Sequence, residues 1–340
     1  MRSHAARAME RLPVAPAWLG LAAVPLLIGA FIAGAWLSGE LASFRSTGVP
    51  WFRDRGARLG VVIALLAAYL PVARGYARAF AAESLRALRA EVGAPSKVSP
   101  AGSFDRPVRR AASACGLLCV PLVALLIDRD PSLYLMRDYW SSTTVWTWSL
   151  GLFLGWQLGA FAWEVVAGSR AVGRLAEELP PPDLFDLAAL APCARQGVRS
   201  GLLCVIFVSI FALNFGDRGF LWVAALLVPA AALLIGLAVW IPVRGARRRI
   251  RESKRAELAQ IHRALRGDAT AAGRLRVGGR ADPRGLQDLL AYRSFVISVR
   301  EWPFDASSAA RVALYLLIPL GSWLGGALIE QALAVLLRGG

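Results

Sequence analysis

Residues 222–240 read WVAALLVPAAALLIGLAVW, a stretch without a charged side chain between Trp222 and Trp240. As an α-helix this stretch would be roughly 27 Å long at 1.5 Å per residue, close to the roughly 30 Å hydrocarbon core of a bilayer. Indole rings prefer the headgroup level, so the two tryptophans mark the two edges of a membrane. Trp18 and Trp36 bracket a second uncharged stretch of the same length. Both stretches therefore predict helices that cross a membrane.

Five other apolar stretches are long enough, or nearly so, to cross a membrane: 59–80, 111–127, 143–168, 200–216 and 308–337. The composition agrees, because 56% of the residues are hydrophobic and 18% are charged, against about 45–50% and about 25% in soluble domains. The expected fold class is all-α, a polytopic transmembrane helix bundle of about seven spans. We expect residues 1–243 to form a bundle with six spans, 244–307 a basic cytoplasmic loop with amphipathic helices, and 308–340 a kinked C-terminal span.

The distribution of charge orients this bundle. With the N-terminus inside, 31 of the 39 Lys and Arg residues fall in the inner segments, which are 1–16, 74–110, 169–199 and 244–311. Cytoplasmic loops carry an excess of Lys and Arg, so the N-terminus is expected in the cytoplasm. The first span is longer than the 7–15-residue apolar region of a signal peptide, which favours an uncleaved anchor. Because 37 of the 39 basic residues are Arg, as in GC-rich bacterial genomes, the expected location is the inner (plasma) membrane of a bacterium.

Few polar side chains interrupt the spans, and three of them are candidates for a transport or gating role. Gln157 and Glu164 lie in the fourth span, and Glu330 lies near the far end of the seventh. An ionisable group inside a membrane is a functional candidate by default. The alternative is that these groups bind a neighbouring helix or lie at the headgroup level. Arg74 and Arg78, in the later turns of the second span, are expected to extend their guanidinium groups to the headgroups.

Glycine repeats predict close helix packing. Gly151, Gly155 and Gly159 follow one another at four-residue spacing in the fourth span and therefore share one helix face. A second helix, from this chain or from another copy, can approach such a face backbone to backbone. In the last span, Gly321 and Gly325 interrupt an apolar stretch of about 30 residues, longer than one straight span needs. A kinked span is expected there, with a re-entrant turn as the alternative.

The loop 244–307 is strongly basic, with 15 basic and 7 acidic residues. Contact with anionic lipid headgroups accounts for this charge, and because no nucleic-acid-binding fold is recognisable, we expect no nucleic acid partner. Apolar positions between 286 and 299 predict an amphipathic helix that lies in the membrane interface or packs against helix ends. Beyond it, Trp302, Pro303 and Asp305 predict a rigid elbow, in which the proline ends one helix and Asp305 or Ser307 caps the next. The alternative is a hinge or partner site.

Catalytic motifs are missing from the sequence. The chain has 2 His and 4 Cys, and it contains no Walker A, H-E-x-x-H, G-x-S-x-G or G-x-G-x-x-G pattern. We therefore expect that the protein is not an enzyme and needs no metal or cofactor.

The C-terminal segment carries the one resemblance to known proteins. Residues 300–305 read REWPFD and residues 314–323 read LYLLIPLGSW. This segment resembles part of an uncharacterised family of bacterial multi-pass membrane proteins. The resemblance covers about 40 of the 340 residues, and it implies no activity and no functional residue.

Two functions are compatible with these patterns. The first is a helix-packing scaffold or membrane subunit whose basic cytoplasmic face contacts lipid, a membrane partner or a second copy of the chain. The second is a channel or transporter with a path lined by the broken seventh span and by Glu330 or Gln157. The scarcity of polar residues inside the spans favours the first, because a path for polar solutes usually needs side-chain ligands.

Overall fold

The computed structural model describes residues 14–40, 55–92, 106–128, 131–136, 139–185, 187–214, 221–272, 275 and 286–299. The expected seventh span at 308–337 lies outside the described residues, and so does the segment that resembles the uncharacterised family. The same holds for several residues singled out in the sequence: Trp302, Pro303, Asp305, Gly321, Gly325 and Glu330.

Six long helices make up most of the described residues: α2 (Val14–Leu37), α4 (Arg55–Val92), α5 (Arg106–Asp128), α6 (Ser142–Glu178), α7 (Ala191–Ala212) and α8 (Leu221–Leu265). Each contains a stretch long and apolar enough to cross a membrane. The shorter elements are η2 (Pro131–Leu135), η4 (Ala188–Leu190), α9 (Ala269–Ala272) and α10 (Leu286–Ser298). Across the ranges given above the chain is helical and forms no strand. The prediction of an all-α bundle is therefore confirmed.

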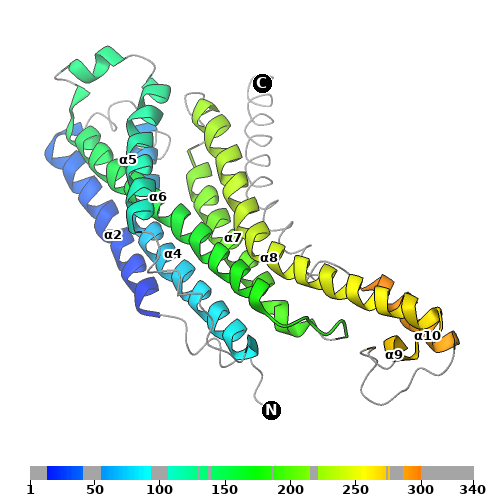
Figure 1. Ribbon diagram of the computed structural model, residues 1–340. Coiled ribbons are helices and arrows are strands. Elements are labelled where there is room, and N and C mark those ends of the chain that lie inside the picture. The colour runs from blue at the N-terminus through cyan, green and yellow to red at the C-terminus, as the bar shows by residue number, and fades with distance from the viewer. Residues whose placement is uncertain are drawn as a thin grey trace, which may run out of the picture.

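Several helices continue well past the apolar stretches that predicted them. The fourth span was expected at 143–168, but α6 runs on to Glu178, and α8 has 45 residues, or about 68 Å of helix. Figure 1 shows α8 bending where it leaves the bundle and continuing as a long helical extension. Hydropathy marks the part of a helix that lies in lipid, whereas Arg, Ala, Leu and Glu beyond that part are all good helix formers in water.

The helices pack around α6, which contacts α4, α5 and α8, while α7 lies against α4 and α8, and α2 against α4. Successive helices run in opposite directions. We call the side where α4 and α6 end and where α8 continues as a charged helix the basic face, and the other side the opposite face. Pro25, Pro71, Pro121 and Pro229 lie inside these helices, which membrane-spanning helices tolerate.

Two apolar cores hold the described helices together. The first, in the middle of the spans, joins α4, α6, α7 and α8 through residues such as Leu66, Phe161, Phe207 and Ile235. The second lies at the basic face and joins the ends of α4 and α6 to the start of α7, to the extension of α8 and to α10. Because this second core includes Ile250 and Ile261 of α8, the charged extension is attached to a folded unit.

The amphipathic helix expected near 286–299 is α10, and it packs against α8. Tyr292 and Val296 are buried in the basic-face core. Phe185, from the loop after α6, stacks on Phe295 with ring centroids 4.5 Å apart. Lys254 of α8 donates from Nζ to two carbonyl oxygens at the C-terminal end of α10, 2.7 and 3.0 Å away. These contacts fix α10 against α8 and the basic-face core.

Candidate functional site

A cluster of charged and polar side chains joins α4 to α6. Arg74 reaches across from α4 and donates from Nη2 and Nε to the two carboxylate oxygens of Glu164, at 2.8 and 3.2 Å. It also donates from Nη1 to the side-chain oxygen of Gln157. Arg78 forms a second ion pair with Glu164. We call these four residues the polar cluster.

Helical periodicity places the members of the polar cluster. Arg74 and Arg78 are four residues apart on α4, so they lie one above the other on one face. Gln157 and Glu164 are seven residues apart on α6, two turns along the same stripe. The guanidinium group of Arg74 fills the gap between them. Its planar fork matches the carboxylate in a bidentate arrangement, the strongest form of such a contact.

Burial differs sharply across the polar cluster. The side chain of Glu164 is 8% exposed and that of Arg74 is 15% exposed, whereas that of Arg78 is 55% exposed. Two guanidinium groups therefore share one carboxylate, and the excess positive charge lies on the exposed Arg78. A buried charge without a partner is costly, so the bidentate contact of Arg74 is what makes its position inside the bundle tolerable.

Helix length gives the depth of the polar cluster. Arg74 lies 18 residues from Gly56, the first residue of that candidate span, which is roughly 27 Å of helix. Gln157 lies 15 residues from Ser142 at the start of α6, or roughly 22 Å. The hydrocarbon core is roughly 30 Å thick. The polar cluster thus lies near the boundary of the apolar region on the basic face, with Gln157 just inside it.

Two of the three residues singled out for transport or gating, Gln157 and Glu164, are thus brought together through Arg74. The third, Glu330, lies outside the described residues. Arg74 and Arg78 were expected to extend to the headgroups, and their role as partners of Glu164 was missed. The pattern that could have found it is an Arg pair at four-residue spacing late in one span and a carboxylate late in another.

The glycine face of α6 packs on α5 within the same chain. A Cβ placed on Gly155 would lie 2.5 Å from the carbonyl oxygen of Gly116, and one placed on Gly116 would lie 2.9 Å from the amide nitrogen of Gly159. Gly159 itself faces the backbone of Ala112. We call these contacts the glycine seam. Gly151 is less confined, because a Cβ there would meet Val120 at an ordinary 3.6 Å.

A second group of polar contacts joins α4 to α7 nearer the basic face. Gln196, which is buried, donates to Ser200 at 3.1 Å and accepts from Ser84 at 3.4 Å. Arg199 pairs with Glu83 at 2.6 Å. Both contacts use side chains on the facing surfaces of the two helices. They hold helices together and leave little polar surface for a solute.

The basic face has a shallow hollow on α8 where this helix leaves the membrane. It measures about 230 Å³ and is lined by Trp240, Val243 and four arginines at positions 244, 247, 248 and 251. One of these, Arg248, pairs with Glu252 one turn further on at 2.9 Å. An aromatic ring beside clustered guanidinium groups suits the junction between acyl chains and anionic headgroups.

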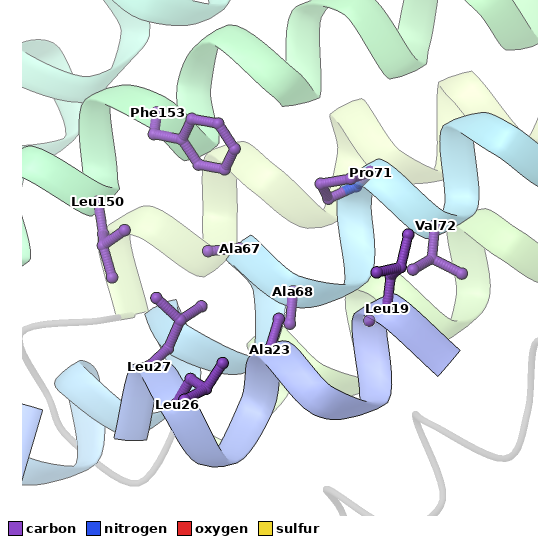
Figure 2. A pocket seen from close by; sticks show the side chains of 11 residues that line it. Leu19, Ala23, Leu26, Leu27, Ala67, Ala68, Pro71, Val72, Leu150 and Phe153 are labelled. Atoms are coloured by element: carbon purple, nitrogen blue, oxygen red, sulfur yellow. The ribbon is translucent and has the colours of Figure 1, made fainter. Parts of the chain in front are cut away.

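An apolar groove of about 600 Å³ runs between α2, α4 and α6. Figure 2 shows leucine side chains of α2, among them Leu19 and Leu26, opposite Ala67, Ala68 and Pro71 of α4. The side chains along this groove are all apolar, so it suits acyl chains and offers no chemical group for a reaction.

Neither metal-binding residues in the described ranges nor similarity to known proteins helps to assign the site. Within the described ranges no three His, Cys, Asp or Glu side chains converge on one point. No protein-family model, no curated protein and no solved structure matches this chain.

Proposed function

We propose that this protein is a helix-packing scaffold or membrane subunit of the bacterial inner membrane, with its N-terminus and its basic face in the cytoplasm. The observation that carries the proposal is the pairing inside the polar cluster. Both carboxylate oxygens of Glu164 and the side-chain oxygen of Gln157 accept hydrogen bonds from Arg74. These three hydrogen bonds therefore hold α4 against α6.

A transport role would require a different arrangement. A carboxylate that binds and releases an ion must exchange partners as the ion passes. Glu164 instead has a bidentate partner in Arg74 and a second one in Arg78. The glycine seam and the Gln196 contacts likewise join helix to helix. The described bundle is thus well suited to a rigid framework with a charged cytoplasmic platform.

Ion flux separates the scaffold from the channel or transporter. The purified full chain would be reconstituted in liposomes containing a pH-sensitive dye, and proton, K⁺ and Cl⁻ gradients would be applied in turn. We expect no flux above that of protein-free liposomes. Flux that is lost in Gln157→Leu or Glu330→Ala, while both variants keep the thermal midpoint of the unmodified protein, would overturn the scaffold and support a path through these residues.

We further propose that the α8 hollow binds anionic lipid headgroups. Each basic side chain near an anionic surface contributes about 1 kcal/mol of attraction. In mixed nanodiscs, native mass spectrometry should find phosphatidylglycerol retained over phosphatidylcholine. The triple variant Arg244→Gln/Arg247→Gln/Arg251→Gln should lose that preference. Arg255→Gln, one turn beyond the hollow on the same helix, is the matched control and should keep it; equal loss in both would refute a defined site.

A further inference from the structure

A cavity distinct from the α8 hollow and the apolar groove lies between α4, α5, α6 and α7, and the proposed scaffold function makes no use of it. It measures about 450 Å³, inside the roughly 300–1,000 Å³ range of small-molecule sites. It extends along α6 from Thr143 to Leu158, a distance of roughly 22 Å at 1.5 Å per residue. The cavity therefore begins at the opposite face and passes beyond the middle of the membrane.

Asn214, just after the end of α7, forms part of the cavity wall. It is only 1% exposed, yet among the described residues neither its amide nitrogen nor its amide oxygen has a hydrogen-bond partner. Buried polar side chains in folded proteins almost always have partners, so an amide without one calls for an explanation. A molecule in the cavity with both a donor and an acceptor, such as a hydroxyl group, would satisfy both atoms.

Polarity changes along the cavity. Tyr139, Thr143 and Thr144 line the end near the opposite face, whereas Leu66 and Leu158 line the deep end. Among the described residues that line it none carries a charge, and Thr143 donates to the carboxylate of Glu40, just after α2. An occupant with a neutral polar head at the membrane surface and an apolar tail toward the membrane centre matches this gradient. Among these described residues an anionic head would find no cation to pair with.

The cavity also reaches the outer surface of α5. Cys119 lines it and is exposed, and the outer surface of a membrane bundle faces lipid. An occupant can therefore arrive sideways from the bilayer. Cys115, one turn earlier on α5, is exposed as well but does not line the cavity.

From this geometry we infer that the cavity binds a neutral single-chain lipid of the monoacylglycerol class, whose head hydroxyls hydrogen-bond to Asn214 and whose acyl chain lies between α5 and α6. The inference does not depend on the scaffold function, because a lipid could occupy the cavity of a scaffold or of a transporter.

The native cysteines of the unmodified protein provide both a probe of this site, Cys119, and a control, Cys115. In detergent micelles, N-ethylmaleimide would be added with and without a monoacylglycerol, and modification of each cysteine followed by mass spectrometry. We expect monoacylglycerol to slow the modification of Cys119 by about fivefold or more, the effect of covering a reactive group, and to leave Cys115 unchanged. Equal rates at Cys119 with and without lipid, or equal slowing at both cysteines, would overturn the inference.

Recognition of the head is tested with a diazirine-bearing monoacylglycerol and a diazirine-bearing fatty acid of the same chain length. Photolabelling by the monoacylglycerol should concentrate on α5 and α6 and fall about fivefold in Asn214→Leu, the loss expected for a hydrogen bond to the head. The fatty acid should label these helices at least fivefold less. Similar labelling by the two probes, or no change in Asn214→Leu, would refute head recognition.

Folding defects are separable from loss of binding. Asn214→Leu removes two buried polar atoms that have no partner among the described residues, so its thermal midpoint without lipid should equal or exceed that of the unmodified protein. Gly151→Phe places a ring in the cavity and should abolish labelling. Gly236→Phe is its control, since the space beside Gly236 is open and lies on α8, away from the cavity. Loss of labelling in Gly236→Phe as well would contradict the assignment.

Discussion

Glu164 joins α6 to α4 through two ion pairs, in addition to the apolar core between these helices. Its carboxylate is 8% exposed and is shared by two guanidinium groups. Removing one partner of a buried ion pair leaves the other charge without compensation, which typically costs about 3–5 kcal/mol. Here Arg74 can partly recover hydration by extending toward the basic face, so the loss should fall at the lower end of that range.

Glu164→Met should therefore lower the free energy of unfolding by about 3 kcal/mol, measured by denaturant titration in micelles. Arg74→Met should cost a similar amount, while the double variant should cost much less than the sum, because apolar pairs can replace a buried ion pair. Glu83→Gln is the matched control. Its pair with Arg199 is considerably more exposed, so the change should be within about 1 kcal/mol. Additive losses in the double variant would show that the two residues act separately.

The partners of these residues could be predicted only in part. Gln157 and Glu164 stand out in the sequence because polar groups are expensive inside a membrane. Their common partner, Arg74, does not stand out in this way. Spacing along one helix shows which residues share a face, but it does not show which other helix that face contacts. Arg74 was for this reason expected to reach the headgroups alone. The sequence does not single out Asn214, because one amide at the end of a span belongs to no recognisable pattern.

At the level of the elements, the glycine seam sets the distance between α5 and α6. Gly155→Ala would place a methyl group 2.5 Å from the backbone of Gly116, closer than any real contact, so the helices must move apart. We expect a loss of about 1–3 kcal/mol, as for overpacking in a core. Gly236→Ala, which meets nothing within 4 Å, should instead be neutral or stabilising by up to about 1 kcal/mol, because alanine is the better helix former. Losses of equal stability in the two variants would show that the glycine seam does not set the distance between α5 and α6.

Besides the buried side chains of Tyr292 and Val296, a lysine and an aromatic stack hold α10 in position. Lys254 donates to the carbonyl oxygens of Ile297 and Val299, which lack helical partners at the end of α10. Lys254→Met keeps the aliphatic stem and removes both hydrogen bonds. Hydrogen exchange of α10 should then become about fivefold faster, the effect of losing about 1 kcal/mol, while exchange in α4 and α6 stays unchanged. Lys254→Arg, which keeps a donor, should show a smaller change; a global rise in exchange would refute a local role.

Hydropathy predicts where the membrane spans lie, but it does not predict where the helices begin and end. The six described spans were found because each needs about 20 apolar residues to cross a bilayer. The end of α6 lies beyond the expected span 143–168, at Glu178, because a helix that leaves lipid continues as long as its residues favour helix. The start of α7 at Ala191, nine residues before the expected span, follows the same rule.

Across the whole molecule, the pairing of helices follows from contacts that lie far apart in the chain. Short connections make neighbours of α5 and α6 and of α7 and α8, which could be expected. The contacts of α4 with α6 and α7, and of α6 with α8, join helices that are not consecutive, and hydropathy carries no information about them. They form where small residues and polar partners happen to face each other, as Gly173 and Gly245 do between α6 and α8.

The orientation of the whole bundle follows from charge and can be tested by labelling from one side. Single cysteines at Ser132 and at Ala259, both exposed and on opposite faces, would be introduced after the four native cysteines are replaced by alanine. If the basic face is cytoplasmic, a membrane-impermeant maleimide should modify Ser132→Cys in intact cells, and Ala259→Cys only after the cells are permeabilised. The reverse pattern would place the N-terminus outside.

Since Arg and Lys are retained on the cytoplasmic side during insertion, moving these charges to the other face should change the orientation of the helices in the membrane. An extra pair of arginines beside Ser132, with Arg247, Arg248 and Arg249 changed to glutamine, should therefore give a mixed pattern of labelling.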